Sequence, residues 1–145
     1  MTPVRHPRVL IVEDDPDLLV VLRVNLRAAG FETLLASDGV TALARLAAER
    51  PDVVLLDVML PGMDGWRVLE EIHARGDASA VVVCSAKQNP EDIDRAEALG
   101  VGGYLVKPFD LDRVVDAAND VVVRRRLVGQ PSPSPSAQLG ELGLA

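Results

Sequence analysis

The sequence predicts an α/β domain built on a single doubly wound, five-stranded parallel sheet that five helices cover. Five short apolar runs alternate with five segments in which apolar residues recur every three or four positions, as in strands and amphipathic helices. Several of the runs are apolar throughout, which is typical of parallel strands buried on both faces. With 145 residues, 48% of them hydrophobic, the chain is long enough for one such core.

The expected strands are short, and turn residues or polar residues follow each of them. They span residues 8–12 (RVLIV), 31–36 (FETLLA), 53–56 (VVLL), 80–84 (AVVVC) and 103–106 (GYLV). The third strand ends on a single carboxylate, Asp57, and residues 61–65 (PGMDG) then supply turn chemistry. Right-handed crossovers between parallel strands bring the carboxyl ends of all the strands to one edge of the sheet.

Each strand is followed by a segment with one apolar face and a recognisable helix start or stop. Apolar helical spacing starts near Pro16, Ala42, Trp66, Pro90 and Leu111. Asp15 before Pro16, and Asn89 before Pro90, suit an N-cap followed by proline at the first helical position. Gly30, Gly76 and Gly100 are the expected stops of three of these helices.

Polar side chains stand where the expected strands end. Glu13 and Asp14 follow the first strand, Asp57 ends the third, Ser85 follows the fourth and Lys107 follows the fifth. Because these strand ends share one edge of the sheet, we expect the side chains to lie close together. Ligands of open α/β sheets bind at this edge, so the set is a candidate reactive site.

Three carboxylates in one place need a proton or a positive charge between them. Two like charges about 4 Å apart repel by roughly 4 kcal/mol at an effective dielectric of 20. Raised pKa values, Lys107 or a divalent cation would each relieve the repulsion, and we favour Mg²⁺ assisted by Lys107. A carboxylate beside such a cation can attack phosphorus and form an aspartyl phosphate, with Lys107 and Ser85 as ammonium and hydroxyl donors.

Four stretches of the sequence form a recognisable set: VLIVEDD at 9–15, VVLLDVMLPGMDG at 53–65, VVVCSA at 81–86 and GYLVKPF at 103–109. In this order they resemble the receiver domain of bacterial two-component response regulators. The resemblance runs from about Arg8 to Arg126 and implies the flavodoxin-like fold of chemotaxis regulators, with strand order 2-1-3-4-5. It places a receiver domain at residues 8–127, after a leader of residues 1–7.

The resemblance implies a role for each acid at the sheet edge. Asp57 corresponds to the phosphoacceptor and Asp14 to a direct metal ligand. Glu13 corresponds to the second acid, which contacts the metal through water. Met59 would offer only its backbone carbonyl to Mg²⁺, or to Mn²⁺ in its place.

The resemblance also implies how the remaining residues respond to phosphorylation. Lys107 would pair with the phosphoryl oxygens, and the bond between Lys107 and Pro108 corresponds to a cis peptide of the family. Ser85 would be drawn towards the phosphoryl group, and Tyr104 would be the aromatic switch residue that then moves inward. The fourth helix, fifth strand and fifth helix would rearrange with them.

The implied function is a signalling switch that promotes only its own phosphorylation and dephosphorylation, and not an enzyme with an external substrate. A sensor histidine kinase, a phosphotransfer protein or a small phosphodonor would phosphorylate Asp57. The rearranged face would then control a downstream protein or an output domain missing from this chain. The same face would serve a homodimer.

Composition narrows the expected partners and location. A balance of 22 acidic to 15 basic side chains, a net charge of −7, argues against direct nucleic-acid binding. Cys84 is the only cysteine, and residues 1–8 lack a long apolar segment, so we expect a cytoplasmic protein without a membrane anchor. Residues 128–145, rich in proline and serine, are expected to be a disordered tail or a truncated linker.

Simpler structural roles and other functions compete with this interpretation. Taken singly, Asp57 would be a turn cap, Ser85 a strand-end hydroxyl and Tyr104 a half-buried aromatic. A haloacid-dehalogenase-like phosphatase also has an aspartate after an apolar strand, but it needs a second acid two residues later, where this chain has Met59. A phosphorylation-independent pseudo-receiver is the other alternative, and the intact acids and Lys107 count against it.

Overall fold

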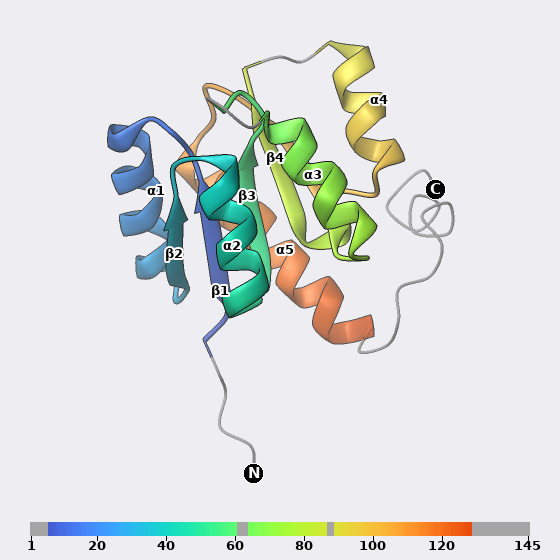
Figure 1. Ribbon diagram of the computed structural model, residues 1–145. Helices are drawn as coiled ribbons and strands as arrows, with labels where there is room; N and C mark the ends of the chain where they lie inside the picture. Colours follow the sequence, from blue (N-terminus) through green and yellow to red (C-terminus); the bar gives the residue numbers. More distant parts are fainter. Residues whose placement is uncertain (1–5, 61–63, 87–88, 129–145) are drawn as a thin grey trace.

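The computed structural model describes residues 6–60, 64–86 and 89–128, and it contains a central sheet between helices (Figure 1). The strands are β1 (Arg8–Val12), β2 (Glu32–Ala36), β3 (Val53–Asp57), β4 (Val81–Ser85) and β5 (Gly103–Val106). They follow the order β2-β1-β3-β4-β5, and every neighbouring pair is parallel. The predicted fold class and strand order are therefore confirmed.

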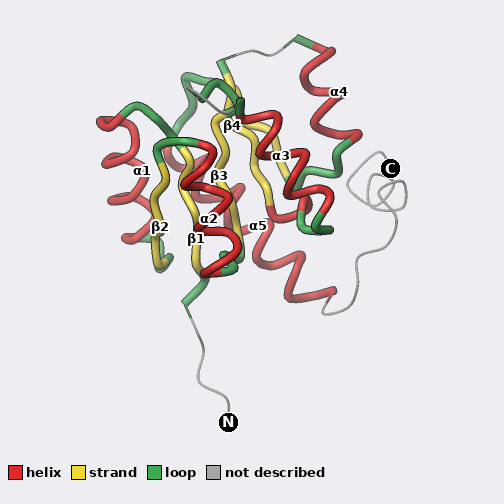
Figure 2. The backbone as a smooth tube through the Cα atoms, viewed as in Figure 1, coloured by secondary structure: helices red, strands yellow, loops and turns green. Residues whose placement is uncertain are grey.

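Helices cover both faces of this sheet (Figure 2). They are α1 (Pro16–Ala28), α2 (Gly39–Glu49), α3 (Gly65–Ala74), α4 (Pro90–Ala98) and α5 (Leu111–Val128). One apolar cluster joins α1 and α5 to one face of the sheet, and a second joins α2, α3 and α4 to the other. No helix within the described ranges has the length and apolar character to cross a membrane.

Helix starts follow the capping residues that the sequence predicts. The Asp15 carboxylate accepts a hydrogen bond of 3.0 Å from the Asp17 N–H, and the Asn89 side-chain oxygen accepts one of 2.9 Å from the Asp92 N–H. Asp15 thus serves α1 by satisfying N–H groups that have no partner inside the helix. This separates it from Glu13 and Asp14.

Several element boundaries differ from those predicted. The fourth strand was predicted at residues 80–84, but Ala78–Ala80 form a short 3₁₀ helix and β4 is Val81–Ser85. The second strand starts at Glu32, because the Phe31 N–H bonds back to the Leu26 carbonyl at the end of α1. Because β4 extends to residue 85, Ser85 is the last residue of that strand and not the first residue of the loop after it. Helix α5 also continues to Val128, beyond the apolar positions that predicted it.

The two central strands are almost completely shielded from solvent. Val9, Leu10 and Ile11 of β1 are fully buried, and all five residues of β3 are buried, including Asp57 at 4% exposure. Such rigid strands fix the direction in which residues at their ends point. Residues 1–5 of the predicted leader and residues 129–145 of the predicted tail lie outside the described residues.

Gly65, the first residue of α3, packs directly against the chain that leaves β3. Its N–H donates to the Val58 carbonyl at 3.2 Å. A Cβ atom there would lie 2.5 Å from the Asp57 carbonyl oxygen and still closer to the Cα of Val58. All of these are backbone atoms of Asp57 and Val58, which cannot give way without moving the end of β3.

We expect Gly65→Ala to lower the free energy of unfolding by about 2 kcal/mol through this overpacking, as measured by urea denaturation. Gly103→Ala is the matched control, because its new Cβ would meet only Val82 methyl groups at 3.6 Å. The control should change stability by less than about 1 kcal/mol. Equal effects of the two substitutions would contradict the close packing of α3 on β3.

Candidate functional site

The candidate site lies at the carboxyl ends of β1, β3 and β5. Asp57 is the last residue of β3, Glu13 follows β1, and Lys107 follows β5. The Glu13 N–H donates to the Ala36 carbonyl at 3.0 Å, and the Lys107 N–H donates to the Ser85 carbonyl at 2.7 Å. These bonds continue the sheet ladders beyond the strands, so the backbones of both residues are fixed. The Lys107–Pro108 peptide bond is cis, as the family resemblance implied.

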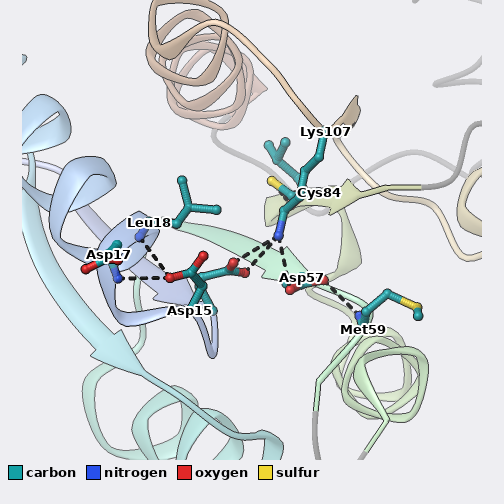
Figure 3. A network of polar contacts seen from close by, with 9 residues as sticks. Asp15, Asp17, Leu18, Asp57, Met59, Cys84 and Lys107 are labelled. Carbon is teal, nitrogen blue, oxygen red and sulfur yellow. Dashed lines mark hydrogen bonds and ion pairs between the residues drawn. The ribbon is translucent and has the colours of Figure 1, made fainter.

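Lys107 bridges two buried carboxylates (Figure 3). Its Nζ lies 2.9 and 3.1 Å from the two carboxylate oxygens of Glu13 and 3.2 Å from Oδ2 of Asp57. The other oxygen of Asp57, Oδ1, accepts a hydrogen bond of 2.8 Å from the Met59 N–H. Both carboxylates are more than nine-tenths buried, at 3% and 4% exposure. Each oxygen of Asp57 therefore has its own donor.

A third carboxylate opens this cluster to solvent. One oxygen each from Glu13, Asp14 and Asp57 lies within 4.8 Å of the other two, and Asp14 is exposed while its partners are buried. Oxygens on opposite sides of a Mg²⁺ ion are about 4.2 Å apart, since each Mg–O distance is close to 2.1 Å. A small inward movement, or a bridging water, would let all three acids share one ion. The donor set consists of hard oxygens and fits Mg²⁺ or Mn²⁺.

The cluster carries more negative charge than its surroundings accommodate. Burial is the main cause that raises the pKa of Glu13 from 4.5 to about 7. The nearby Asp57 carboxyl adds to this rise, and Lys107 opposes it. Burial alone would lower the pKa of Lys107, but its contacts with Glu13 and Asp57 outweigh burial and raise it. Lys107 therefore stays charged, and Glu13 holds its proton until the pH is near neutral.

Ser85 ends the strand beside β3, and Tyr104 lies on β5 shortly before Lys107, but side-chain alternation along these strands places both on the opposite face of the sheet from Asp57. Ser85 is fully buried at the end of β4, and Tyr104 pairs with Val83 within the sheet. Tyr104 packs against the apolar cluster that includes α3 and α4 residues. The structure thus brings Glu13, Asp14, Asp57 and Lys107 together. The two predicted switch residues are not part of this cluster.

Cys84 is a neighbour of the site that the residue pattern did not reveal. It pairs with Asp57 in the register between β3 and β4, and Figure 3 shows it beside Lys107. Burial raises the pKa of its thiol to about 12, so the side chain stays neutral. It therefore adds no further charge to the cluster. Its position depends on strand register, which residue spacing alone does not specify.

The chain belongs to the response regulator receiver domain family, whose model matches residues 9–119. It is thus a receiver domain of two-component systems, a family of signalling proteins and not of classical enzymes.

Particular relatives and solved structures agree with this family. The chain is 38% identical over 141 residues to the transcriptional regulatory protein PrrA of Mycobacterium tuberculosis, covering 97% of this chain and 60% of that protein. It is 41% identical over 113 residues to the regulator of RpoS of Escherichia coli, covering 77% and 34%. The chain therefore spans 60% or less of the length of these curated relatives.

Two solved structures with similar folds are themselves receiver domains or chemotaxis regulators. The Francisella response regulator 1452 receiver domain has a TM-score of 0.77 and 28% identity, covering 81% of this chain and 98% of that chain. The chemotaxis response regulator CheY4 of Vibrio cholerae has a TM-score of 0.74 and 28% identity, covering 81% and 99%.

The charge surplus leads to opposite stability effects at two positions. In the metal-free protein near pH 8, Asp57→Asn should raise the free energy of unfolding by about 1 to 2 kcal/mol, because it removes one of two repelling carboxylates. Lys107→Met keeps an apolar stem but leaves both carboxylates uncompensated, so it should lower that free energy by about 3 kcal/mol. Urea denaturation in the presence of a chelator measures both effects.

The pH dependence of stability provides a further check. Because folding raises the pKa of Glu13 to about 7, the folded state binds more protons than the unfolded state between pH 4.5 and 7. The stability that protonated Glu13 contributes is therefore lost as the pH rises through about 7. The loss of free energy of unfolding caused by Lys107→Met should then be larger at about pH 8, where Glu13 is charged, than at about pH 5. Arg113→Met, which removes an exposed cation, is the control and should change stability little. If Asp57→Asn lowered the free energy of unfolding, that result would contradict a surplus of negative charge in the acidic cluster.

Proposed function

We propose that this receiver domain is a phosphorylation-activated switch that accepts a phosphoryl group on Asp57. The observation that supports this most is the position of the Lys107 Nζ, 3.2 Å from Asp57 Oδ2, beside a cluster of three acids. The Met59 N–H holds the other oxygen of Asp57. A phosphoryl group arriving at Oδ2 would therefore meet an ammonium group already in position, so little reorganisation is needed.

The proposed donor is a phosphohistidine of a sensor kinase or phosphotransfer protein, or a small phosphodonor. Asp57 Oδ2 would attack the phosphorus in line with the bond to the leaving group. With phosphohistidine the phosphorus–nitrogen bond breaks, and the imidazole leaves with the electron pair and takes up a proton. With acetyl phosphate the phosphorus–oxygen bond breaks, and acetate leaves with the electron pair. Lys107 would then exchange its contacts with the carboxylates for contacts with the phosphoryl oxygens.

The acids provide a site for a divalent cation. Glu13, Asp14, Asp57 and the backbone carbonyl of Met59 would hold Mg²⁺, or Mn²⁺ in its place. The ion would neutralise charge that gathers on the phosphoryl oxygens during transfer. Glu13, whose pKa is about 7 without a cation, would lose its proton when the ion binds.

Phosphorylation would be transmitted through the opposite face of the sheet. We propose that the Ser85 hydroxyl turns towards the phosphoryl group and that Tyr104 moves inward behind it. Reversing a two-state equilibrium from 1:99 to 99:1 takes about 5.5 kcal/mol. Charge-assisted hydrogen bonds contribute roughly 1.5 to 3 kcal/mol each, so a few of them suffice.

Helix α4 is held by contacts that such a movement would have to break. Arg95 of α4 forms an ion pair of 2.9 Å with Glu70 of α3, and its guanidinium carbon lies 4.4 Å from the centre of the Trp66 ring. His73 Nδ1 lies 2.9 Å from the Leu99 carbonyl oxygen at the end of α4. Exposed contacts of this kind are weak individually, which suits a helix that must change position.

The proposed output surface is formed by α4, β5 and α5. It would contact a downstream protein, an output domain outside this chain or a second copy of the chain. The same proposal has three further parts. This chain does not bind nucleic acid directly, it acts in the cytoplasm, and its receiver domain spans residues 8–127. Family membership disfavours the phosphatase alternative, and a pseudo-receiver remains the outcome to exclude by experiment.

Acetyl phosphate and Mg²⁺ provide the direct test, with intact mass as the readout. We expect a gain of one phosphoryl group, because Asp57 and Lys107 are already in contact. The adduct should disappear with Asp57→Asn or when the metal is chelated. Asp15→Asn is the matched control, since this nearby acid caps α1, and it should leave the adduct intact. The absence of any adduct, together with no response to beryllofluoride, would favour a pseudo-receiver.

A further inference from the structure

A cleft of about 600 Å³ runs along the outer edge of β2, away from the acidic cluster. Among the residues that the structure describes, β2 pairs with β1 on one side only, and β1 separates it from β3, which carries Asp57. Residues from α1, β2, α2 and the turn before β2 line the cleft, and they include Arg23, Arg27, Phe31, Thr33, Leu35 and Arg45. This volume is typical of sites that bind ligands.

The backbone of β2 offers unused hydrogen-bonding groups to the cleft. The Glu32 N–H donates to the Pro7 carbonyl, and the Ala36 carbonyl accepts from the Glu13 N–H, so these alternate residues face β1. In a parallel ladder the intervening residues direct their N–H and carbonyl groups to the other side. Thr33 and Leu35 therefore present a donor and an acceptor each to the open edge, as in edges that accept an added strand.

Arginines approach this edge from both faces of the sheet. Arg23 and Arg27 come from α1 on one face, and Arg45 comes from α2 on the other. Arg45 is already paired with Glu49 at 3.0 Å. Within the part of the chain that the structure describes, neither Arg23 nor Arg27 forms an ion pair, and the buried Nε of Arg23 has no hydrogen-bond partner.

The cleft therefore has a positive rim on a chain whose net charge is −7. Glu32, the one acid among the described residues that line it, is paired with Arg8 at 3.0 Å. Two leucines of β2 add apolar groups to the lining, since Leu34 packs against one core cluster and Leu35 against the other, and both are only partly buried. The cleft thus combines positive side chains, leucines and unpaired backbone groups of β2, and this combination favours the binding of an extended acidic peptide.

We propose that the β2 edge binds an extended acidic segment of a partner protein as an additional strand of the sheet. Its backbone would bond to Thr33 and Leu35. Side chains of a strand alternate between faces, so its acids would meet Arg23 and Arg27 on one face and Arg45 on the other. The proposal is independent of phosphorylation at Asp57.

Two fluorescein-labelled octapeptides test the charge requirement on the full chain by fluorescence anisotropy. One has the sequence VVEEVVEE, which places valine and glutamate on both faces of an added strand, and the other, VVKKVVKK, replaces every glutamate with lysine. Only the glutamate peptide should bind. The double variant Arg23→Gln/Arg27→Gln should weaken its binding at least about tenfold. Arg67→Gln/Arg113→Gln removes the same charge from exposed positions outside the cleft and should leave binding unchanged.

A backbone substitution tests strand addition separately from charge. Thr33→Pro removes an outward N–H that β1 does not use, and it should also weaken binding about tenfold. If that variant does not fold, hydrogen exchange in the unaltered protein gives the same information. The amide of Leu35 should then exchange at least about tenfold more slowly when the glutamate peptide is bound.

Three results would overturn the proposal. Equal binding of the lysine peptide would show that the arginines do not select the ligand. Full affinity of the Thr33→Pro variant, or unchanged exchange at Leu35, would show that acids bind without adding a strand. A concentration-dependent dimer that excludes the peptide and is lost in Thr33→Pro would show that a second copy occupies this edge.

Discussion

The contact of one ammonium group with two buried carboxylates is the constraint on which the rest of the structure depends. Lys107 reaches Glu13 and Asp57 only because β1, β3 and β5 end at the same edge of a parallel sheet. Buried β1 and β3 hold the two acids in place, and the ladder bond from Lys107 to Ser85 fixes the lysine. Without the ammonium, two charges would lie uncompensated in a shielded site, which proteins avoid.

The same contact explains why a stable fold would retain an unfavourable cluster. Glu13 is held in an environment that raises its pKa to about 7, so the metal-free site is a compromise among three acids and one base. A divalent cation or a phosphoryl group would supply partners that the protein alone does not. Sites prepared for a ligand commonly cost stability when the ligand is absent, because their charges are arranged for the bound state.

Apolar periodicity, capping residues and turn residues predict most of the fold. They do not predict strand register or which side chains from different elements become neighbours. Asp15 and Asn89 cap the helices that they were expected to cap, since capping is a local interaction. The start of β4 was misplaced because Ala78–Ala80 form a 3₁₀ helix, which has no apolar signature of its own. Cys84 meets the site through its pairing with Asp57, and pairing is a property of the assembled sheet.

The acidic site and the β2 edge also differ in how far the sequence predicts them. The acidic site was predictable because each of its residues ends or follows a strand, and parallel topology then brings them together. The arginine-rimmed edge of β2 combines α1, β2 and α2 residues with no shared motif, so only the folded chain shows it. Local sequence rules thus identify residues at strand ends more readily than surfaces assembled from neighbouring elements.

The affinity for Mg²⁺ in the unaltered protein and in Lys107→Met, measured by isothermal titration calorimetry, tests the surplus of negative charge most directly. If Lys107 neutralises the carboxylates that would hold the ion, its loss should tighten Mg²⁺ binding at least about tenfold. Binding that is unchanged or weaker in a folded Lys107→Met protein would contradict the surplus, because the acids would then not be competing for the same positive charge.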